Sequence, residues 1–365
     1  VRRTVYWSPQ NGTFIPADRW LGLAEHRFSP GVREMGCREA LHCSFEVASD
    51  NLQRTAQLSI SGRCLREMVE TQGRAVLAAQ RSGSLRPAFT AAECTAQTLI
   101  TGADGVMVPL VTEQQKHKRR ETESARRLEQ GRSSTASVGR PRRGSEGPYH
   151  EFKLVAFYDP DKSHCHVVGT SGDGQAAGGL MRREARRLGL SRAKVKYAVS
   201  DGAEWIAHQY RRQLPMLDEH ILDYYHLRDH VVQTSHVLHG EGTKKAEQWR
   251  EDLMGCVWQQ GSLVMLDRLG PYLRRHRAGP KQEVLASLRD YVGKRVAMTD
   301  YPTFRQLGYD CGSGPTESLC GRLTDRLKGP GMRWDSSNAE AMMALAGLYH
   351  SGLWSTYWKS ERTAA

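Results

Sequence analysis

Five short apolar segments rich in β-branched residues recur in the middle of this chain, and they are punctuated by Asp, Gly or Pro. They span 98–110, 151–160, 163–174, 194–202 and 219–226. Segments of this length and composition predict buried β-strands. A short turn, Asp159-Pro160-Asp161, joins the second to the third, and a helical pattern precedes the fourth. The sequence therefore predicts an α/β fold with a mixed five-stranded sheet that starts antiparallel and is flanked by helices.

Further helices are predicted on both sides of these strands. Residues 1–95 contain amphipathic stretches such as "ISGRCLREMVETQGRAVLAAQ", which indicate a mainly helical N-terminal region. Residues 227–306 repeat apolar side chains at helical spacing, among them Trp249, Leu253 and Val257. This second region is predicted to be an all-α insertion into the sheet domain.

Charge and cysteine content narrow the class of protein. The 365 residues include 52 Lys and Arg against 40 Asp and Glu, and a formal net charge of +12 indicates a polyanionic partner such as nucleic acid. No run of about 18 apolar residues and no signal-peptide pattern occurs, so we expect a cytoplasmic protein without membrane contact. Cys37, His42 and Cys43 could hold a metal, but packing of reduced thiols is the favoured interpretation.

A basic segment rich in Ser and Gly interrupts the strand region at 114–148. It has almost no large apolar residues, so it cannot form a core and is predicted to be a disordered linker. Simple solvation would explain its charge, and contact with DNA phosphates would explain it equally well. Lys118, Arg119 and Arg120 are the candidate phosphate contacts in this segment.

Three acidic residues stand at predicted turns or element ends: Asp104, Asp201 and Glu317. Each has a local explanation, because Asp-Gly is a common turn pair and Glu is favoured in a first helical turn. Together they are more specific. If the first and fourth strands are neighbours, Asp104 and Asp201 lie side by side, and a helix across the sheet can add Glu317. Such carboxylates suit two divalent cations and phosphodiester chemistry.

Basic residues follow Glu317 on the same predicted helix. Arg322 and Arg326 are four residues apart and are predicted to share a helix face, and Lys328 follows them. Contact with a DNA backbone beside Glu317 is one interpretation of these three residues. A solvated basic face is the other.

Four segments resemble the signature blocks of a known family: "GADGVMVPL", "AVSDGAEWI", "ILDYYHLRDHV" and "GSGPTESLCGRLTDRLKGPGMRW". They are similar to those of bacterial insertion-sequence DDE transposases of the ISKra and ISLre groups, which are mutator-like enzymes with a ribonuclease-H-like core. The resemblance runs from about Thr98 to Met343. The front of the chain lacks the cysteine pairs that many relatives carry there, so it offers no zinc finger for recognising DNA ends.

The resemblance implies that Asp104, Asp201 and Glu317 form a catalytic triad that binds two Mg²⁺ or Mn²⁺ ions. It also implies a role for Asp223 and His226, an Asp-x-x-His element that would place His226 near the scissile phosphate. A structural histidine is the alternative for His226.

The implied activity is cleavage of element ends and strand transfer into target DNA, by a homo-oligomer on double-stranded DNA at the bacterial nucleoid. Residues 1–95 would precede a ribonuclease-H-like core made of 96–226 and 307–365, which the insertion 227–306 divides. A nuclease without strand transfer and a non-catalytic DNA-binding remnant are the alternatives. No nucleotide cofactor is expected, because the glycine-rich segment 169–179 lacks a phosphate-loop Lys.

Overall fold

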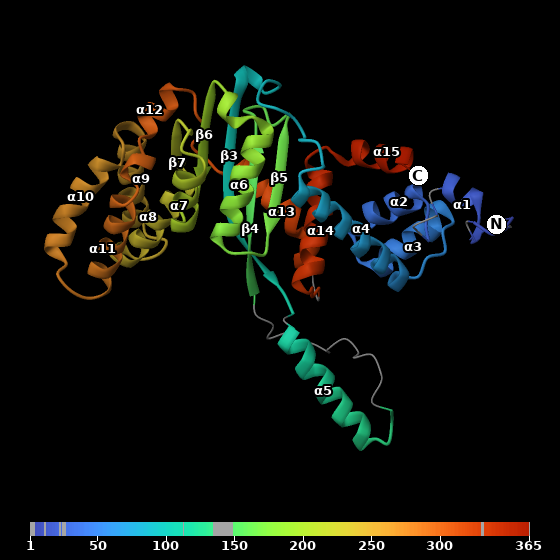
Figure 1. Cartoon of the computed structure of the whole chain (residues 1–365). Helices are drawn as coiled ribbons and strands as arrows, with labels where there is room; N and C mark the ends of the chain where they lie inside the picture. The colour runs from blue at the N-terminus through green and yellow to red at the C-terminus, as the bar shows by residue number, and fades with distance from the viewer. Residues whose placement is uncertain are drawn as a thin grey trace.

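A five-stranded mixed sheet lies at the centre of the fold (Figure 1). The computed structural model describes residues 4–10, 12–21, 23, 27–111, 113–133, 149–329 and 332–364. The strands are β3 (Thr98–Pro109), β4 (Tyr149–Tyr158), β5 (Cys165–Thr170), β6 (Val195–Ser200) and β7 (Glu219–Leu222). Their order is β5-β4-β3-β6-β7, with β3 antiparallel to β4 and parallel to β6. The predicted mixed sheet, with its first and fourth strands adjacent, is therefore confirmed.

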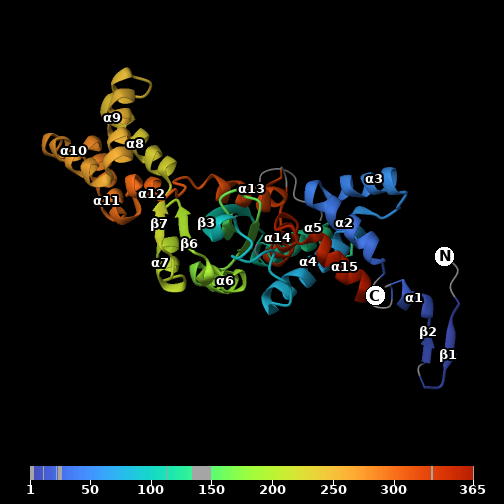
Figure 2. The ribbon, with the colours of Figure 1, turned by 90° about the horizontal axis from the view of Figure 1, so that it is seen from above.

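Helices cover both faces of the sheet, as the view from above shows (Figure 2). Those on one face are α6 (Gly174–Leu188) and α7 (Glu204–Gln213), and those on the other are α13 (Gly314–Lys328) and α14 (Ser336–His350). Strand alternation sends Leu99 and Ala103 to the α6 face and Ile100 to the α13 face. Local signals set the helix ends: Asp173 caps the start of α6, and Gly189, with φ of 74°, ends it.

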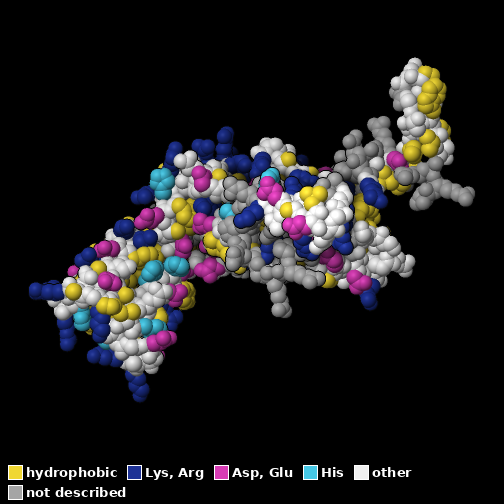
Figure 3. Space-filling view, turned by 90° about the horizontal axis from the view of Figure 1, so that it is seen from below, with side chains coloured by type: hydrophobic (Ala, Val, Ile, Leu, Met, Phe, Trp, Pro, Cys, Tyr) yellow, Lys and Arg dark blue, Asp and Glu magenta, His cyan; other side chains and the backbone are white. Residues whose placement is uncertain are grey.

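The N-terminal region is mainly helical but begins with a hairpin that the sequence patterns did not indicate. Its elements are β1 (Tyr6–Ser8), β2 (Gly12–Phe14), α1 (Pro16–Trp20), α2 (Pro30–His42), α3 (Phe45–Ala56) and α4 (Gly62–Ser82). The hairpin projects from the body and exposes hydrophobic side chains, including Trp7, which is 70% exposed (Figure 3). The helices instead pack on the end of the chain: Gln72 in α4 donates a 2.7 Å hydrogen bond to Tyr357 in α15 (Trp354–Ala364).

The segment between β7 and α13 is a helical array at one end of the molecule (Figure 1). It comprises α8 (Tyr224–His239), α9 (Lys244–Gln260), α10 (Ser262–Arg275), α11 (Pro280–Gly293) and α12 (Tyr301–Gln306). The predicted strand 219–226 is wrong in its second half, because β7 ends at Leu222 and Asp223 caps α8 by accepting the backbone N–H of His226 at 2.6 Å. Among the residues that the structure describes, no helix has both the length and the apolarity to span a membrane.

The first half of the predicted disordered linker is a helix. α5 (Glu113–Glu129) projects away from the sheet at the end of the β3–β4 hairpin (Figure 1). Its long charged side chains are good helix formers, and pairs such as His117 with Glu121 (3.2 Å) and Arg127 with Glu123 (3.7 Å) support it one turn apart. Low hydrophobicity ruled out a core position without ruling out a helix. The rest of the predicted linker, 134–148, lies outside the described residues.

Candidate active site

Asp104 and Asp201 come from neighbouring parallel strands. The last paired residues of β3 and β6 are Ala103 and Ser200, which lie opposite each other, and an aspartate follows on each strand. The two carboxylates are therefore placed at the same level of the sheet. Asp201 also starts a turn in which its Oδ1 accepts the N–H of Ala203 at 2.9 Å, so the local role that the Asp-Gly pair predicts is present as well.

Glu317 reaches the sheet because α13 packs unusually close to β3. A Cβ at Gly102 would lie 1.8 Å from Oγ1 of Thr316, so only glycine permits this approach. Thr316 also lies within 3.3 Å of the Tyr158 hydroxyl on β4. Glu317 follows in the first turn of α13, where the helix dipole favours a carboxylate and Ser313 Oγ donates to its Oε1 at 2.7 Å. The predicted capping role and the predicted approach to the sheet thus coexist.

The three acids line one pocket of about 380 Å³. Its wall is formed by Ala103, Asp104, Asp201, His226, Asp229, Ser313, Thr316 and Glu317. These residues belong to β3, the end of β6, the first turns of α8 and the start of α13. The fold therefore brings together all four residues that the sequence assigned to catalysis.

The surroundings of Asp104 in the pocket shift its pKa. Burial raises the pKa of Asp104 above its ordinary value, and the nearby carboxylates of Asp201 and Glu317 raise it further. The backbone N–H of Gly105, 2.7 Å from Oδ1 of Asp104, and the charge of Lys328 act in the opposite direction. Negative charge is thus concentrated in a partly desolvated pocket, an arrangement that a cation would relieve.

The donor set of the pocket suits a hard divalent cation. Carboxylate oxygens are the ligands that Mg²⁺ and Mn²⁺ prefer, and Asp104, Asp201 and Glu317 together offer six. In this conformation Glu317 is engaged with Ser313. Across the described residues, no three His, Cys, Asp or Glu side chains lie close enough together to hold one metal ion. The carboxylates share a pocket and raise the pKa of Asp104, but they do not form a closed ligand cage.

Helix α8 contributes more to the pocket than the sequence indicated. His226 is exposed at the pocket wall, and Asp229, one helical turn further along, lines the same wall. Asp223 is buried instead, and its carboxylate accepts the backbone N–H groups of His226 and of Ser313, which ties the start of α8 to the start of α13. Asp229 is not among the site residues predicted from the sequence. Helical periodicity could have found it, because residues three apart share a face.

The helical array between β7 and α13 also holds the loop that follows Asp201. Tyr291 in α11 donates its hydroxyl to the carbonyl oxygen of Asp201 at 3.1 Å, and Arg295 binds the carbonyl of Gly202 through two nitrogens at 2.7 and 2.9 Å. The His230 ring of α8 lies 3.9 Å from the Tyr291 ring. The helical array therefore fixes the backbone at Asp201 and Gly202.

The predicted basic contacts on α13 divide into two kinds. Arg322 and Lys328 are exposed, and Lys328 is close enough to Asp104 to lower its pKa. Arg326 is buried, with 8% exposure: its Nε donates to the carbonyl of Ala40 at 2.7 Å, and its guanidinium lies 5.0 Å from the Phe45 ring. The prediction of Arg326 as a DNA contact is therefore wrong, because the N-terminal helices cover that face of α13.

The basic residues predicted in the linker lie on α5. Lys118 and Arg120 are exposed, and the side chain of Arg119 lies outside the described residues. Because α5 projects from the sheet, Lys118 and Arg120 are accessible to a polyanion at a distance from the acidic pocket (Figure 1).

The cysteines near the front take part in packing, in line with the favoured interpretation. Cys37 is fully buried, which raises the pKa of its thiol, and Cys43 donates its Sγ hydrogen to the carbonyl of Glu39 at 3.3 Å. The His42 ring packs edge-on against Tyr349. All eight cysteines are free thiols.

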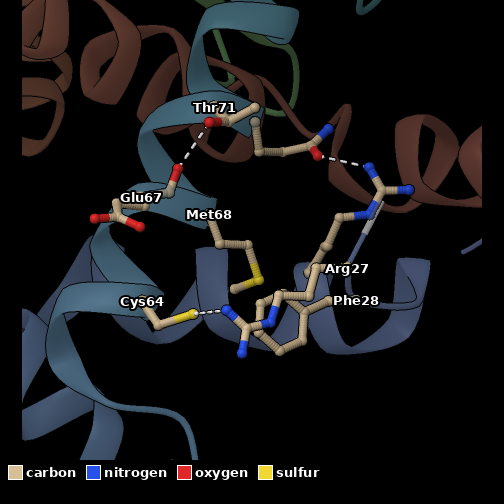
Figure 4. Close-up of a pocket in the computed structure, with 8 residues that line it drawn as sticks. Arg27, Phe28, Cys64, Glu67, Met68 and Thr71 are labelled. Carbon is tan, nitrogen blue, oxygen red and sulfur yellow. Dashed lines mark hydrogen bonds between the residues drawn. The ribbon is translucent and has the colours of Figure 1, made fainter. Parts of the chain in front are cut away.

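A second hollow, of about 230 Å³, lies among the N-terminal helices (Figure 4). Arg27 and Phe28 face Cys64 and Met68 of α4 across it, and Nη1 of Arg27 approaches Sγ of Cys64 at 3.8 Å. Its wall also includes the guanidinium of Arg33. Two guanidinium groups and a single carboxylate give this hollow the opposite charge to the acidic pocket, so it is not a candidate cation site.

Neither the models of known protein families nor the curated proteins match this chain.

Proposed function

We propose that this protein is a DDE-type DNA transposase that cleaves element ends and joins them to target DNA with the help of divalent cations. The observation that carries the proposal is the delivery of Asp104 and Asp201 by adjacent parallel strands and of Glu317 by α13 to one pocket. The resemblance of the sequence blocks around these residues to the mutator-like family supports the same conclusion.

The layout of the core supports the proposal. In the sheet, only β4 runs antiparallel to the central strand β3, and β5, β6 and β7 all run parallel to β3. This arrangement, with α13 packed on β3, is compatible with a ribonuclease-H-like fold. The helical array between β7 and α13 lies where the family resemblance expects an insertion before the last acid.

In the proposed site, Asp104, Asp201 and Glu317 would hold Mg²⁺ or Mn²⁺. A pair of such ions, when bound, supplies Lewis-acid activation of the attacking water and stabilisation of the leaving oxygen. His226, which lines the same pocket, would orient the scissile phosphodiester. Lys328, at the far end of α13, is placed to meet a neighbouring phosphate.

The partners follow from the same proposal. Double-stranded DNA would occupy the acidic pocket only with its charge neutralised by cations, and the net charge of +12 would attract the rest of the duplex. Recognition of paired element ends implies a homo-oligomer assembled on DNA.

The test is a cleavage assay with the purified full chain on supercoiled DNA, with Mg²⁺ or Mn²⁺, scored separately for cut and for joined products. We expect Asp104→Asn and Glu317→Gln each to lower the rate by about 10³-fold, roughly 4 kcal/mol of transition-state stabilisation. Asp267→Asn, an exposed carboxylate on α10, is the matched control and should cut like the parent.

A second measurement makes the test independent of the choice of DNA. Mg²⁺ should raise the thermal midpoint of the parent protein and of Asp267→Asn, but not that of Asp104→Asn, because a ligand that binds only the folded state stabilises it. Parent-like cleavage or a parent-like Mg²⁺ response in Asp104→Asn would refute the proposal. Cut products without joined ones would identify a nuclease.

A further inference from the structure

An arginine-rich cleft lies outside the acidic pocket, where the end of α4 meets the side of α6. It has a volume of about 590 Å³, and its lining contains only Arg, Ser and Gly. The arginines are Arg81 from α4 and Arg182, Arg183, Arg186 and Arg187 from α6. No other hollow described above carries so many charges of one sign.

Two buried or half-buried carboxylates organise part of this cluster. Glu184 is 1% exposed and accepts hydrogen bonds from Arg183 at 2.7 Å and Arg187 at 2.8 Å. Burial alone would raise the pKa of Glu184, but the hydrogen bond and charge of His166, together with the arginines, hold it at about 2. Arg81 is paired with Glu340 at 2.7 Å.

Arg182 and Arg186 remain available for a ligand. Both are exposed, and neither makes an ion pair or side-chain hydrogen bond within the described part of the chain. Five arginines against two carboxylates leave the cleft with three positive charges in excess. Arg182 and Arg186 are one turn apart, which separates them by about 6 Å along the α6 axis.

The cleft is distant from the acidic pocket in the fold. α6 packs on the face of the sheet opposite to α13, as Figure 2 shows, and the arginines occupy its second half, which runs away from the level of Asp104. The edge strand β5 lies between α6 and α14. A ligand in the cleft would therefore not occupy the acidic pocket.

We propose that this cleft binds the sugar-phosphate backbone of DNA, as a second contact separate from the acidic pocket. Guanidinium groups bind phosphate oxygens in pairs of hydrogen bonds, and a row of them along a helix suits a polymer with regularly spaced charges. An acidic protein partner fits less well, because protein interfaces need aromatic or aliphatic anchors and the cleft offers none. The choice of DNA among polyanions rests on the proposed function.

The experiment compares the full chain with Arg182→Gln/Arg186→Gln. The matched control is Arg274→Gln/Arg275→Gln, an exposed arginine pair at the end of α10. Binding of a short DNA duplex of arbitrary sequence is measured over a range of salt concentrations. Loss of two phosphate contacts should reduce the slope of log affinity against log salt by about 1.8 and weaken binding on the order of 100-fold near 50 mM salt. The control should keep the parent slope or lose less than half as much.

Each other outcome overturns the inference. An unchanged slope in Arg182→Gln/Arg186→Gln means that the cleft does not hold DNA. Loss of polyglutamate binding with unchanged DNA binding would identify an acidic protein partner instead. Failure of this inference and failure of the proposed function give different results. If only the inference fails, Asp104→Asn abolishes cleavage while the cleft variant keeps the parent slope. If only the proposed function fails, the slope falls in the cleft variant while Asp104→Asn still cuts.

Discussion

Helices α13 and α6 lie on opposite faces of the same sheet, and both carry arginines four residues apart: Arg322 and Arg326 on α13, and Arg182 and Arg186 among the four arginines of α6. On α6, Arg182 and Arg186 are both exposed beside an open cleft. On α13, Arg322 is exposed, whereas Arg326 is buried against the N-terminal helices. Equal spacing on a helix therefore does not give equal exposure, because the surroundings of each helix differ.

The surroundings explain the difference. α6 packs on the sheet and on α7, so the side that carries Arg182 and Arg186 stays open. α13 is enclosed between β3, α14 and the N-terminal helices, and Arg326 meets Ala40 of α2 and the rings of Phe45 and Trp334. An arginine on the helix beside the acidic pocket is therefore buried in the core, whereas two arginines on the helix across the sheet remain at the surface.

The largest effect on stability is expected for Arg326→Ala. The substitution removes a charged hydrogen bond to Ala40, two cation–π contacts and a buried stem, which together amount to about 4 kcal/mol. Urea unfolding measures the change. Arg186→Ala, the matched arginine of α6, should shift stability by less than about 0.5 kcal/mol. Comparable losses in the two variants would show that the contrast between the helices is absent in solution.

The next effect concerns the anchor of the α6 arginines. Folding lowers the pKa of Glu184 to about 2, below its value in the unfolded chain. The ionised carboxylate therefore stabilises the folded protein above roughly pH 4, and this contribution is lost as the pH falls toward 2. We expect Glu184→Gln to lower the free energy of unfolding by about 3 kcal/mol at pH 7 and by progressively less on acidification. Urea unfolding at a series of pH values measures this change.

The control for Glu184 is Glu67→Gln on α4, whose side chain is 56% exposed. It should change stability by less than about 0.5 kcal/mol. A loss at Glu184→Gln that stays constant from pH 7 to acid would contradict the ionised, arginine-bound state of this carboxylate.

A smaller effect is expected where α13 rests on β3. In Gly102→Ala the new Cβ would meet Oγ1 of Thr316 at 1.8 Å, so the helix must shift, at about 2 kcal/mol, and carry Glu317 away from Asp104. The free energy of unfolding measured in urea, and the rise in thermal midpoint that the proposed function predicts for Mg²⁺, should both decrease. On α6, Gly179 has open space around it, so Gly179→Ala should be neutral or stabilising by up to about 1 kcal/mol. Equal behaviour of the two glycines would argue against the close approach of α13.

The smallest effect is expected for Lys328→Gln. Burial and the carboxylates of Asp201 and Glu317 raise the pKa of Asp104, and the charge of Lys328 opposes them, so its removal raises the pKa of Asp104 further. In the proposed cation site Asp104 must be ionised to bind Mg²⁺, so the pH at which Mg²⁺ is expected to begin stabilising the protein should move upward. Arg322→Gln, on the same helix, is the control. An identical pH profile in Lys328→Gln would place Lys328 outside the reach of Asp104.

Much of the core and of the candidate site could be predicted from the sequence. Apolar, β-branched segments identified the strands, because such segments become stable mainly by burial in a sheet. An aspartate directly after Ala103 and one directly after Ser200 needed only the adjacency of β3 and β6 to meet. The position of Glu317 at the start of a helix could also be predicted from the sequence. The second half of the predicted strand 219–226 is instead the start of α8, because Asp223 caps this helix.

Only the tertiary structure decided which charged side chains are exposed to solvent or line a pocket, and which are buried. Ala40 and Arg326 are 286 residues apart, and no local pattern announces their hydrogen bond. The same holds for Asp229, which lines the pocket because α8 is tied to the start of α13 through Asp223, and for the cleft that α4 and α6 form together. Local sequence sets the helices, the strands and their alternation, because these depend on neighbouring residues. Exposure depends on contacts between distant segments, so it is fixed only when the chain has packed.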